Sequence, residues 1–239
     1  MSMTRLSLFL ALIGVLVGGT AQASEANIRK TFETKVSGAK VESVSKTPMP
    51  GVFEVIADGH IFYVDEKVDF VMRGTLFDAR TSELRNLTKT REAQIAAQIL
   101  RKSTDNAIKR VRGSGKRVIY TFEDPNCGFC RRQQAELMKL NDVTIYTFLW
   151  PILAADSVEK SRAVWCSKDR AKAWDDLMSN GVLPKGDNNC PTPFDRNVEL
   201  ARRFGAQGTP AIYLSDGSNV GGYLAADKLE AALRSVDAR

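Results

Sequence analysis

The sequence is poor in residues that bind transition metals, with one histidine and four cysteines among 239 residues. A structural zinc site needs four Cys or His ligands, usually as two closely spaced pairs. Cys127 and Cys130 form one such pair, but Cys166 and Cys190 stand far apart, and His60 lies in the other half of the chain. We therefore predict no metal site, and we predict no cofactor.

Long apolar runs are missing beyond the start of the chain. The segment 6–17 is almost entirely apolar, but it is shorter than the ~20 residues that cross a bilayer as a helix. Arg5 precedes this run, and Ala21-Gln22-Ala23 follows it with small residues where a signal peptidase reads. Residues 1–23 are therefore predicted to be a signal peptide cleaved after Ala23, with a retained anchor as the alternative. We expect an exported chain with no stable membrane insertion.

Charge of one sign is never sustained over a long stretch, although the formal net charge is +6. The densest basic run is Lys109-Arg110-Val111-Arg112, with Lys116-Arg117 on the other side of Gly113-Ser114-Gly115. Acidic residues are interleaved with basic ones elsewhere, so this run is interpreted as a solvated linker. Export also argues against a nucleic-acid partner, and none is predicted.

Residues 24–84 are expected to form a small α+β domain. Two β-type runs, Val52–Ala57 and His60–Asp65, flank Asp58-Gly59, and this dipeptide is typical of a two-residue hairpin turn. A helix is predicted over 26–36, and further strands over 68–72 and 75–77. Residues 85–115 are predicted to be a linker, with a helix over 88–108.

The order of elements in residues 116–239 is typical of a thioredoxin-like domain. A buried strand over 118–122 runs into the Cys127-Gly128-Phe129-Cys130 motif, and a helix over 131–140 follows. The remaining predicted elements are a strand over 143–149, helical structure over 157–178, a strand over 211–214 and a helix over 225–234.

The Cys127–Cys130 motif is interpreted as a redox pair at a helix N-terminus. Free backbone N–H groups and the helix dipole would stabilise a thiolate on Cys127, the form that attacks disulfides. Cys130, nearly one turn further on, would resolve a mixed disulfide by attacking the sulfur of Cys127. The alternative is a purely structural disulfide, although so short a loop gains little entropy.

Three other sets of residues are candidates for the site. Thr209-Pro210, at a strand start, predicts a cis peptide bond beside the sulfurs, with an ordinary trans proline as the alternative. Cys166 and Cys190 are predicted to form a structural disulfide that contributes about 3 kcal/mol, with a second redox relay as the alternative. Glu123 and Asp124 either tune proton transfers at the motif or are surface charges.

Three segments together resemble the DsbC/DsbG family of periplasmic disulfide isomerases, most closely the DsbC branch. They are Asp124-Pro125-Asn126-Cys127-Gly128-Phe129-Cys130, the segment 163–169 around Cys166, and the segment 204–211 around Thr209-Pro210. The resemblance implies a cystatin-like dimerisation domain, a linker helix and a thioredoxin-like catalytic domain with a helical insertion. It implies a periplasmic, V-shaped homodimer that acts on misoxidised exported proteins and is kept reduced by a membrane reductant similar to DsbD.

Two departures from related proteins affect the expected redox properties. Arg131 stands where the DsbC branch carries His, and Thr121 stands where thioredoxin has a buried acid, six residues before the first cysteine. Alternative functions are a DsbG-like reductase of oxidised cysteines, a holdase chaperone and a monomeric oxidase. The leading hypothesis is an isomerase and reductase of protein disulfides.

Overall fold

The computed structural model describes residues 19–186 and 188–238. The predicted signal peptide lies mostly outside the described residues, so cleavage after Ala23 stays a prediction. In the described part of the chain, no helix is both long enough and apolar enough to cross a bilayer. The chain divides between Gly74 and Thr75 into two compact units, and each is described by itself.

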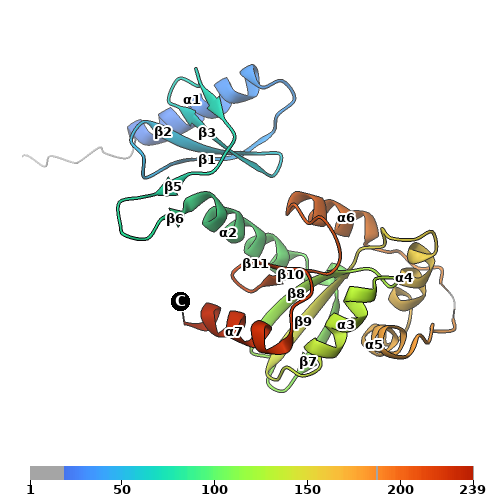
Figure 1. The fold of residues 1–239 in the computed structure, drawn as a ribbon. Coiled ribbons are helices and arrows are strands. Elements are labelled where there is room, and N and C mark those ends of the chain that lie inside the picture. The colour runs from blue at the N-terminus through green and yellow to red at the C-terminus, as the bar shows by residue number, and fades with distance from the viewer. Residues whose placement is uncertain (1–18, 187, 239) are drawn as a thin grey trace, which may run out of the picture. The chain divides into compact units, whose positions relative to one another are not determined.

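The first unit is one helix packed on a four-stranded antiparallel sheet (Figure 1). Its elements are α1 (Gly19–Lys35), β1 (Val41–Lys46), β2 (Val52–Ala57), β3 (His60–Asp65) and β4 (Val71–Met72), with the strands in the order β1-β2-β3-β4. Ile28 and Phe32 of α1 are fully buried and belong to one hydrophobic cluster with Val55 and Val64 of the sheet.

The predicted hairpin in this unit is confirmed. Ala57 pairs with His60, and Asp58 and Gly59 form the turn with φ values of 50° and 78°. Two positive φ values give a turn whose twist matches that of the flanking strands. The strand expected from residue 68 begins later, at Val71, because Val68 also has a positive φ of 55° and its N–H bonds to a carbonyl in the preceding turn.

The second unit is a five-stranded sheet with helices on both faces (Figure 1). The strand order is β11-β10-β8-β9-β7, in which β8 and β9 are parallel and the other pairs antiparallel. Its strands are β7 (Ile108–Arg112), β8 (Arg117–Glu123), β9 (Val143–Leu149), β10 (Ala211–Leu214) and β11 (Asn219–Gly221); β5 (Phe77–Asp78) and β6 (Arg85–Asn86) form a separate ribbon. Its helices are α2 (Leu87–Lys102), η1 (Thr104–Asn106), α3 (Gly128–Leu137), α4 (Ser157–Trp165), α5 (Arg170–Asn180), α6 (Phe194–Arg203) and α7 (Ala226–Asp237).

Alternate residues of β8 belong to two hydrophobic cores, one on each face of the sheet. Tyr120 and Phe122 point to the face covered by α2 and α6, where they pack with Leu100 and Ala201. Ile119 points to the opposite face and packs with side chains of α3 and α7. Successive strand residues face opposite sides of a sheet, so β8 contributes to both cores. Packing on both faces fixes the position of the segment that follows Glu123.

The interpretation of the basic run as a solvated linker is wrong. Residues 108–112 form β7, which pairs antiparallel with β9 at the edge of the sheet, and the preceding helix ends at Lys102. Ile108 and Arg110 are buried while Lys109 and Val111 are exposed, as expected for a strand with one covered face. The basic residues of the run favoured the linker interpretation, although the strand alternates between buried and exposed positions.

The helical structure predicted over 157–178 consists of two helices. α4 ends at Trp165 and α5 begins at Arg170, after Asp169 caps its first turn by accepting from the Lys172 N–H at 2.9 Å. The break places Cys166 outside both helices, where its side chain is directed to a later segment. The segments of β1 and α6 were not predicted as elements.

Gly217 lies very close to the backbone of α2. It follows β10 in a turn with φ of +80°, and a β-carbon there would overlap the Ala93 carbonyl oxygen and lie 2.5 Å from the Ala97 amide nitrogen of α2. Both the positive φ and the contact with backbone atoms favour glycine.

We expect Gly217→Ala to lower the free energy of unfolding by about 2 kcal/mol or more, because the methyl group must push α2 from the sheet. Urea unfolding followed by circular dichroism measures this loss. Gly74→Ala is the control, since that glycine has no positive φ and an added methyl would meet open space. Equal stability of the two variants would contradict the packing described here.

Candidate active site

The first cysteine of the motif caps a helix. β8 ends at Glu123, and Cys127 is the N-cap of α3 with extended backbone angles. Its Sγ accepts from the Cys130 backbone N–H at 3.1 Å and donates to the Thr209 carbonyl at 3.2 Å. The amides at the N-terminus of a helix, together with its dipole, favour negative charge on the capping atom. This arrangement places the Cys127 sulfur at the N-terminus of α3, between the Cys130 amide and the Thr209 carbonyl.

The second cysteine has a different environment. Cys130 is fully buried, whereas 4% of Cys127 is exposed, and both are free thiols. Burial raises the pKa of Cys130 strongly, and the charge of Glu123 and the Cys127 thiol raise it further. Cys130 therefore does not readily lose its proton.

A buried carboxylate fixes the loop before the motif. Asp124 is fully buried and accepts from the backbone N–H groups of Asn126, Ile152 and Leu153 at 2.7, 2.7 and 2.9 Å, and from the Ser157 hydroxyl at 2.9 Å. These bonds join the turn after β8 to the segment after β9. Asp124 is thus a structural anchor, and its interpretation as a surface charge is wrong.

Glu123 is also buried, so its interpretation as a surface charge is wrong too. Burial raises its pKa, and the charge of Asp175 adds to the shift, whereas Arg110 and the Thr121 hydroxyl oppose it. The Thr121 hydroxyl also lies 3.0 Å from Thr147 Oγ1, to which it donates. Within the described residues, neither carboxylate oxygen of Glu123 has a hydrogen-bond partner.

The basic run 109–112 supplies a buried cation that bonds to α3. Arg110 of β7 donates to Gln134 Oε1 at 2.6 Å, to Asp175 Oδ1 at 2.9 Å and to Thr147 Oγ1 at 2.8 Å. Sequence reasoning did not identify these residues. The alternation of buried and exposed positions in β7 was the available signal, and it places Arg110 on the same side as Ile108.

The structure brings Thr209-Pro210 to the first cysteine. The peptide bond between them is cis, Pro210 is buried, and the Thr209 carbonyl is the group that accepts from Cys127. Cys166 and Cys190 are joined in a disulfide with a Cα–Cα distance of 5.8 Å. That disulfide ties the end of α4 to the segment before α6.

Apolar side chains stand exposed near the motif. Phe129 is 53% exposed, and the Arg132 guanidinium lies 4.8 Å from its ring centroid. Ile152 and Leu153, whose amides bond to Asp124, expose 45% and 52% of their surface. These three residues form an exposed apolar surface on the segments that adjoin the motif.

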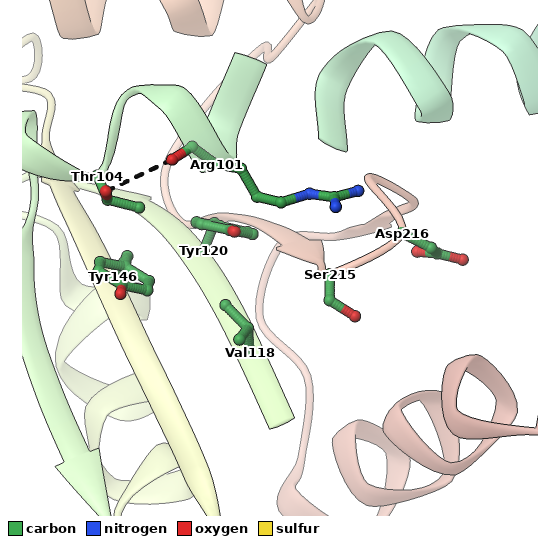
Figure 2. Close-up of a pocket in the computed structure, with 7 residues that line it drawn as sticks. All are labelled: Arg101, Thr104, Val118, Tyr120, Tyr146, Ser215 and Asp216. Carbon is green, nitrogen blue, oxygen red and sulfur yellow. Dashed lines mark hydrogen bonds between the residues drawn. The ribbon is translucent and has the colours of Figure 1, made fainter. Parts of the chain in front are cut away.

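A separate pocket of about 540 Å³ lies on the α2 face of the sheet (Figure 2). Its lining residues are Arg101, Thr104, Val118, Tyr120, Tyr146, Ser215 and Asp216. Val118 and Tyr120 belong to the first half of β8, and Cys127 follows the other end of that strand. This pocket is therefore not part of the thiol site.

A thioredoxin-like sheet that leads into a helix capped by the first of two cysteines, beside a cis-proline, defines a thiol:disulfide oxidoreductase. Two protein families match the chain, namely the disulfide bond isomerase protein N-terminal domain over residues 19–89 and the thioredoxin-like domain over residues 104–237.

Similar proteins carry thiol–disulfide names. A probable thiol:disulfide interchange protein DsbC of Bordetella pertussis is 40% identical over 207 residues, covering 86% of this chain and 73% of the relative. The thiol:disulfide interchange protein DsbC of Escherichia coli K12 is 27% identical over 210 residues, covering 86% and 85%. The crystal structure of a disulfide interchange protein from Neisseria gonorrhoeae superimposes with a TM-score of 0.53 and 41% identity, covering 56% of this chain and 96% of that one. The chain belongs to the DsbC family of thiol:disulfide interchange proteins.

The buried carboxyl of Glu123 predicts a pH-dependent stability. Because its folded pKa is raised, its contribution is fully present below the unfolded pKa and is lost as pH rises through the folded pKa. Glu123→Gln should therefore match the wild type in free energy of unfolding near about pH 4 and exceed it near about pH 8. Urea unfolding of the reduced proteins at both pH values tests this.

Glu92→Gln is the matched control, because Glu92 is an exposed residue of α2. Its difference from wild type should not change with pH. If the Glu123→Gln difference is equally independent of pH, the side chain is not held in an environment that disfavours its charge.

Proposed function

We propose that this oxidoreductase is a protein disulfide isomerase and reductase of the periplasm, with Cys127 as its nucleophile. The observation that carries the proposal is the position of the Cys127 sulfur, 3.1 Å from the Cys130 amide nitrogen at the start of α3 and next to the Thr209 carbonyl. A thiolate there is stabilised by backbone dipoles, and thiolate is the attacking species in disulfide exchange.

The exchange begins on a wrong disulfide of a misoxidised exported protein. The Cys127 thiolate attacks one substrate sulfur, the S–S bond of the substrate breaks, and its other sulfur leaves as a thiolate. That freed thiolate attacks a different disulfide of the substrate, and the last exchange releases Cys127 unchanged. Alternatively, Cys130 attacks Cys127, and the substrate leaves reduced while the enzyme becomes oxidised. A membrane reductant similar to DsbD would then restore the two thiols.

Thr209 and Pro210 are proposed to hold the substrate. The Thr209 backbone already bonds to Cys127, so a peptide that follows this segment lies beside the reacting sulfur. The site also exposes the apolar side chains of Phe129, Ile152 and Leu153. Contact with them does not require particular charges in the substrate. Such a surface suits many unfolded sequences.

The Cys166–Cys190 disulfide is proposed to be structural. It closes a loop with a sequence separation of 24, and such a loop contributes about 3 kcal/mol by restricting the unfolded chain. The neighbouring Trp165 indole donates to the Pro191 carbonyl at 3.1 Å, so the two segments are also joined by a hydrogen bond. Neither sulfur caps a helix N-terminus, in contrast to Cys127.

The first unit is proposed to make the protein a homodimer. β4 is the last strand of its sheet, and the chain around it exposes Phe70, Val71 and Met72 by 76%, 43% and 56%. An open strand edge bearing apolar side chains is a surface on which a second copy can pair.

The isomerase activity is tested by reactivation of scrambled ribonuclease in a glutathione buffer. The wild type should restore ribonuclease activity, and Cys127→Ser should abolish the effect because no attacking sulfur remains. Cys130→Ser should keep part of the activity, since rearrangement within the mixed disulfide needs only Cys127.

A wild type that leaves ribonuclease scrambled, with both thiols reactive, would contradict the isomerase proposal. Reduction of a sulfenic acid by the same protein would then favour a reductase of oxidised cysteines. Suppression of aggregation by Cys127→Ser would instead favour a holdase chaperone, because that activity needs no thiol.

The dimer is tested by sedimentation equilibrium of the mature chain. The wild type should have twice the mass of one chain, and the double variant Val71→Asp, Met72→Asp should have the mass of one, because like charges would meet across the paired edges. Val182→Asp, at an exposed apolar residue of the second unit, should remain dimeric. A wild type with the mass of one chain would rule out the dimer.

A further inference from the structure

Two arginines follow the cysteine motif on α3, and both are exposed. Arg131 Nη2 donates to the Pro125 carbonyl oxygen, 3.5 Å away. The Arg132 guanidinium lies 4.8 Å from the ring centroid of Phe129. Pro125 precedes Cys127 by two residues and Phe129 follows it by two. The two guanidinium groups therefore contact residues before and after the nucleophile.

The positive charge of these arginines is not balanced by acids of the site. Among the described residues, neither guanidinium forms an ion pair, and the first turn of α3 contains no acidic residue. The acids next to the motif, on α3, at the start of α4 and on α5 are either buried or paired with another cation. Glu123 and Asp124 are buried, and the pairs are Glu136–Lys139, Asp156–Lys160 and Asp175–Arg110.

The position of the two arginines does not serve the stability of α3. They are the fourth and fifth residues of the helix, and a helix N-terminus favours negative charge, whereas cations gain from the dipole at the opposite end. Two exposed cations beside a reactive sulfur do, however, attract anionic groups that approach it. Their placement is therefore better explained by what binds at the thiol site.

We propose that Arg131 and Arg132 make the thiol site select disulfides that are flanked by acidic side chains. The proposal rests on the exchange at Cys127 proposed above and specifies its substrates. The exposed apolar side chains near the motif do not distinguish substrates by charge. Two unpaired guanidinium groups add this distinction, because they attract a carboxylate beside the disulfide and repel a lysine or arginine there.

The exchange itself adds negative charge near the arginines. The proton of Cys127 passes to solvent, its sulfur bonds to one substrate sulfur, the substrate S–S bond breaks, and the other sulfur leaves with the electron pair. Cys130 then loses its proton to solvent, bonds to Cys127 and releases the second substrate sulfur. The enzyme pair is oxidised, and the substrate is reduced to two thiols. Cations beside the motif favour an acidic substrate at its first step, when carboxylates and a leaving thiolate are present together.

The first test compares iodoacetate with iodoacetamide, which are similar in size but differ by one negative charge. Both alkylate Cys127 of the reduced protein, as mass spectrometry verifies, and the ratio of the two rates cancels any change in the intrinsic reactivity of the sulfur. We expect this ratio in wild type to exceed that of the neutral thiol mercaptoethanol by about three- to fivefold. The double variant Arg131→Gln, Arg132→Gln should lose this preference.

Three controls separate charge from structure. Lys116→Gln should keep the preference, because Lys116 is exposed and precedes β8, at the opposite end of the strand from Cys127. That strand spans about 20 Å, beyond the screening length of about 8 Å at physiological salt. Arg131→Lys, Arg132→Lys keeps both charges and should retain most of the preference. In wild type, salt at about 1 M should remove it, since the screening length is then about 3 Å.

The second test uses peptide disulfides as substrates. Three cyclic peptides have one disulfide each and are identical except that glutamate, glutamine or lysine flanks both cysteines. An excess of reduced protein reduces them in a single turnover followed by chromatography, and each rate is divided by the rate with dithiothreitol, which corrects for the reactivity of the disulfide itself. Wild type should prefer the glutamate peptide to the lysine peptide by about tenfold, and the double glutamine variant should treat the three alike.

Each outcome decides between the proposals. Equal corrected rates for the three peptides in wild type, or the same order of rates in the double glutamine variant, would overturn the selection and leave the exchange at Cys127 intact. A preference for iodoacetate without a preference among the peptides would also overturn it. Reduction of none of the peptides, while Cys127 is alkylated, would instead contradict the function proposed above. If the double glutamine variant does not fold, the salt series of wild type decides, and a preference that persists at high salt would overturn the role of the two charges.

Discussion

The rest of the site depends on one interaction, the bond between the Cys127 sulfur and the Cys130 amide in the first turn of α3. A sulfur at this position takes the place of the hydroxyl or carboxylate that usually caps a helix. This bond requires the end of β8 to be held in a fixed position relative to the start of α3. The buried carboxylate of Asp124 provides this, because its hydrogen bonds tie the turn to the segment after β9.

The surroundings of the two cysteines differ because Cys127 is the N-cap of α3 and Cys130 lies within its first turn. Both belong to the hydrophobic cluster that holds Leu149 and Trp174, but the Cys127 sulfur bonds to backbone groups at the N-terminus of α3, whereas Cys130 is fully buried. Burial of Cys130 disfavours its charged form. The low polarity around Cys130 also extends to Glu123, so a thiol and a carboxyl that both resist ionisation lie on the same side of the sheet.

Local patterns predicted much of the fold correctly. The Asp58-Gly59 hairpin and the strands on both sides of the Cys127–Cys130 motif were predicted because apolar alternation and turn residues act over a few positions. The basic run 109–112 was misread, because its buried member, Arg110, is paired with residues of β9, α3 and α5 that are distant in sequence. The burial of Glu123 at the end of β8 was likewise not predicted, because it depends on segments that are distant in sequence.

The sequence by itself determined the chemistry that is possible, namely two closely spaced thiols at a strand-to-helix turn, a threonine-proline pair and no obvious metal ligands. These are properties of residue type and short spacing. Only the tertiary structure decided which polar groups are removed from water. Burial depends on segments that meet from distant parts of the chain. It makes Asp124 an anchor, encloses the carboxyl of Glu123 and gives Cys130 a proton that it does not readily lose.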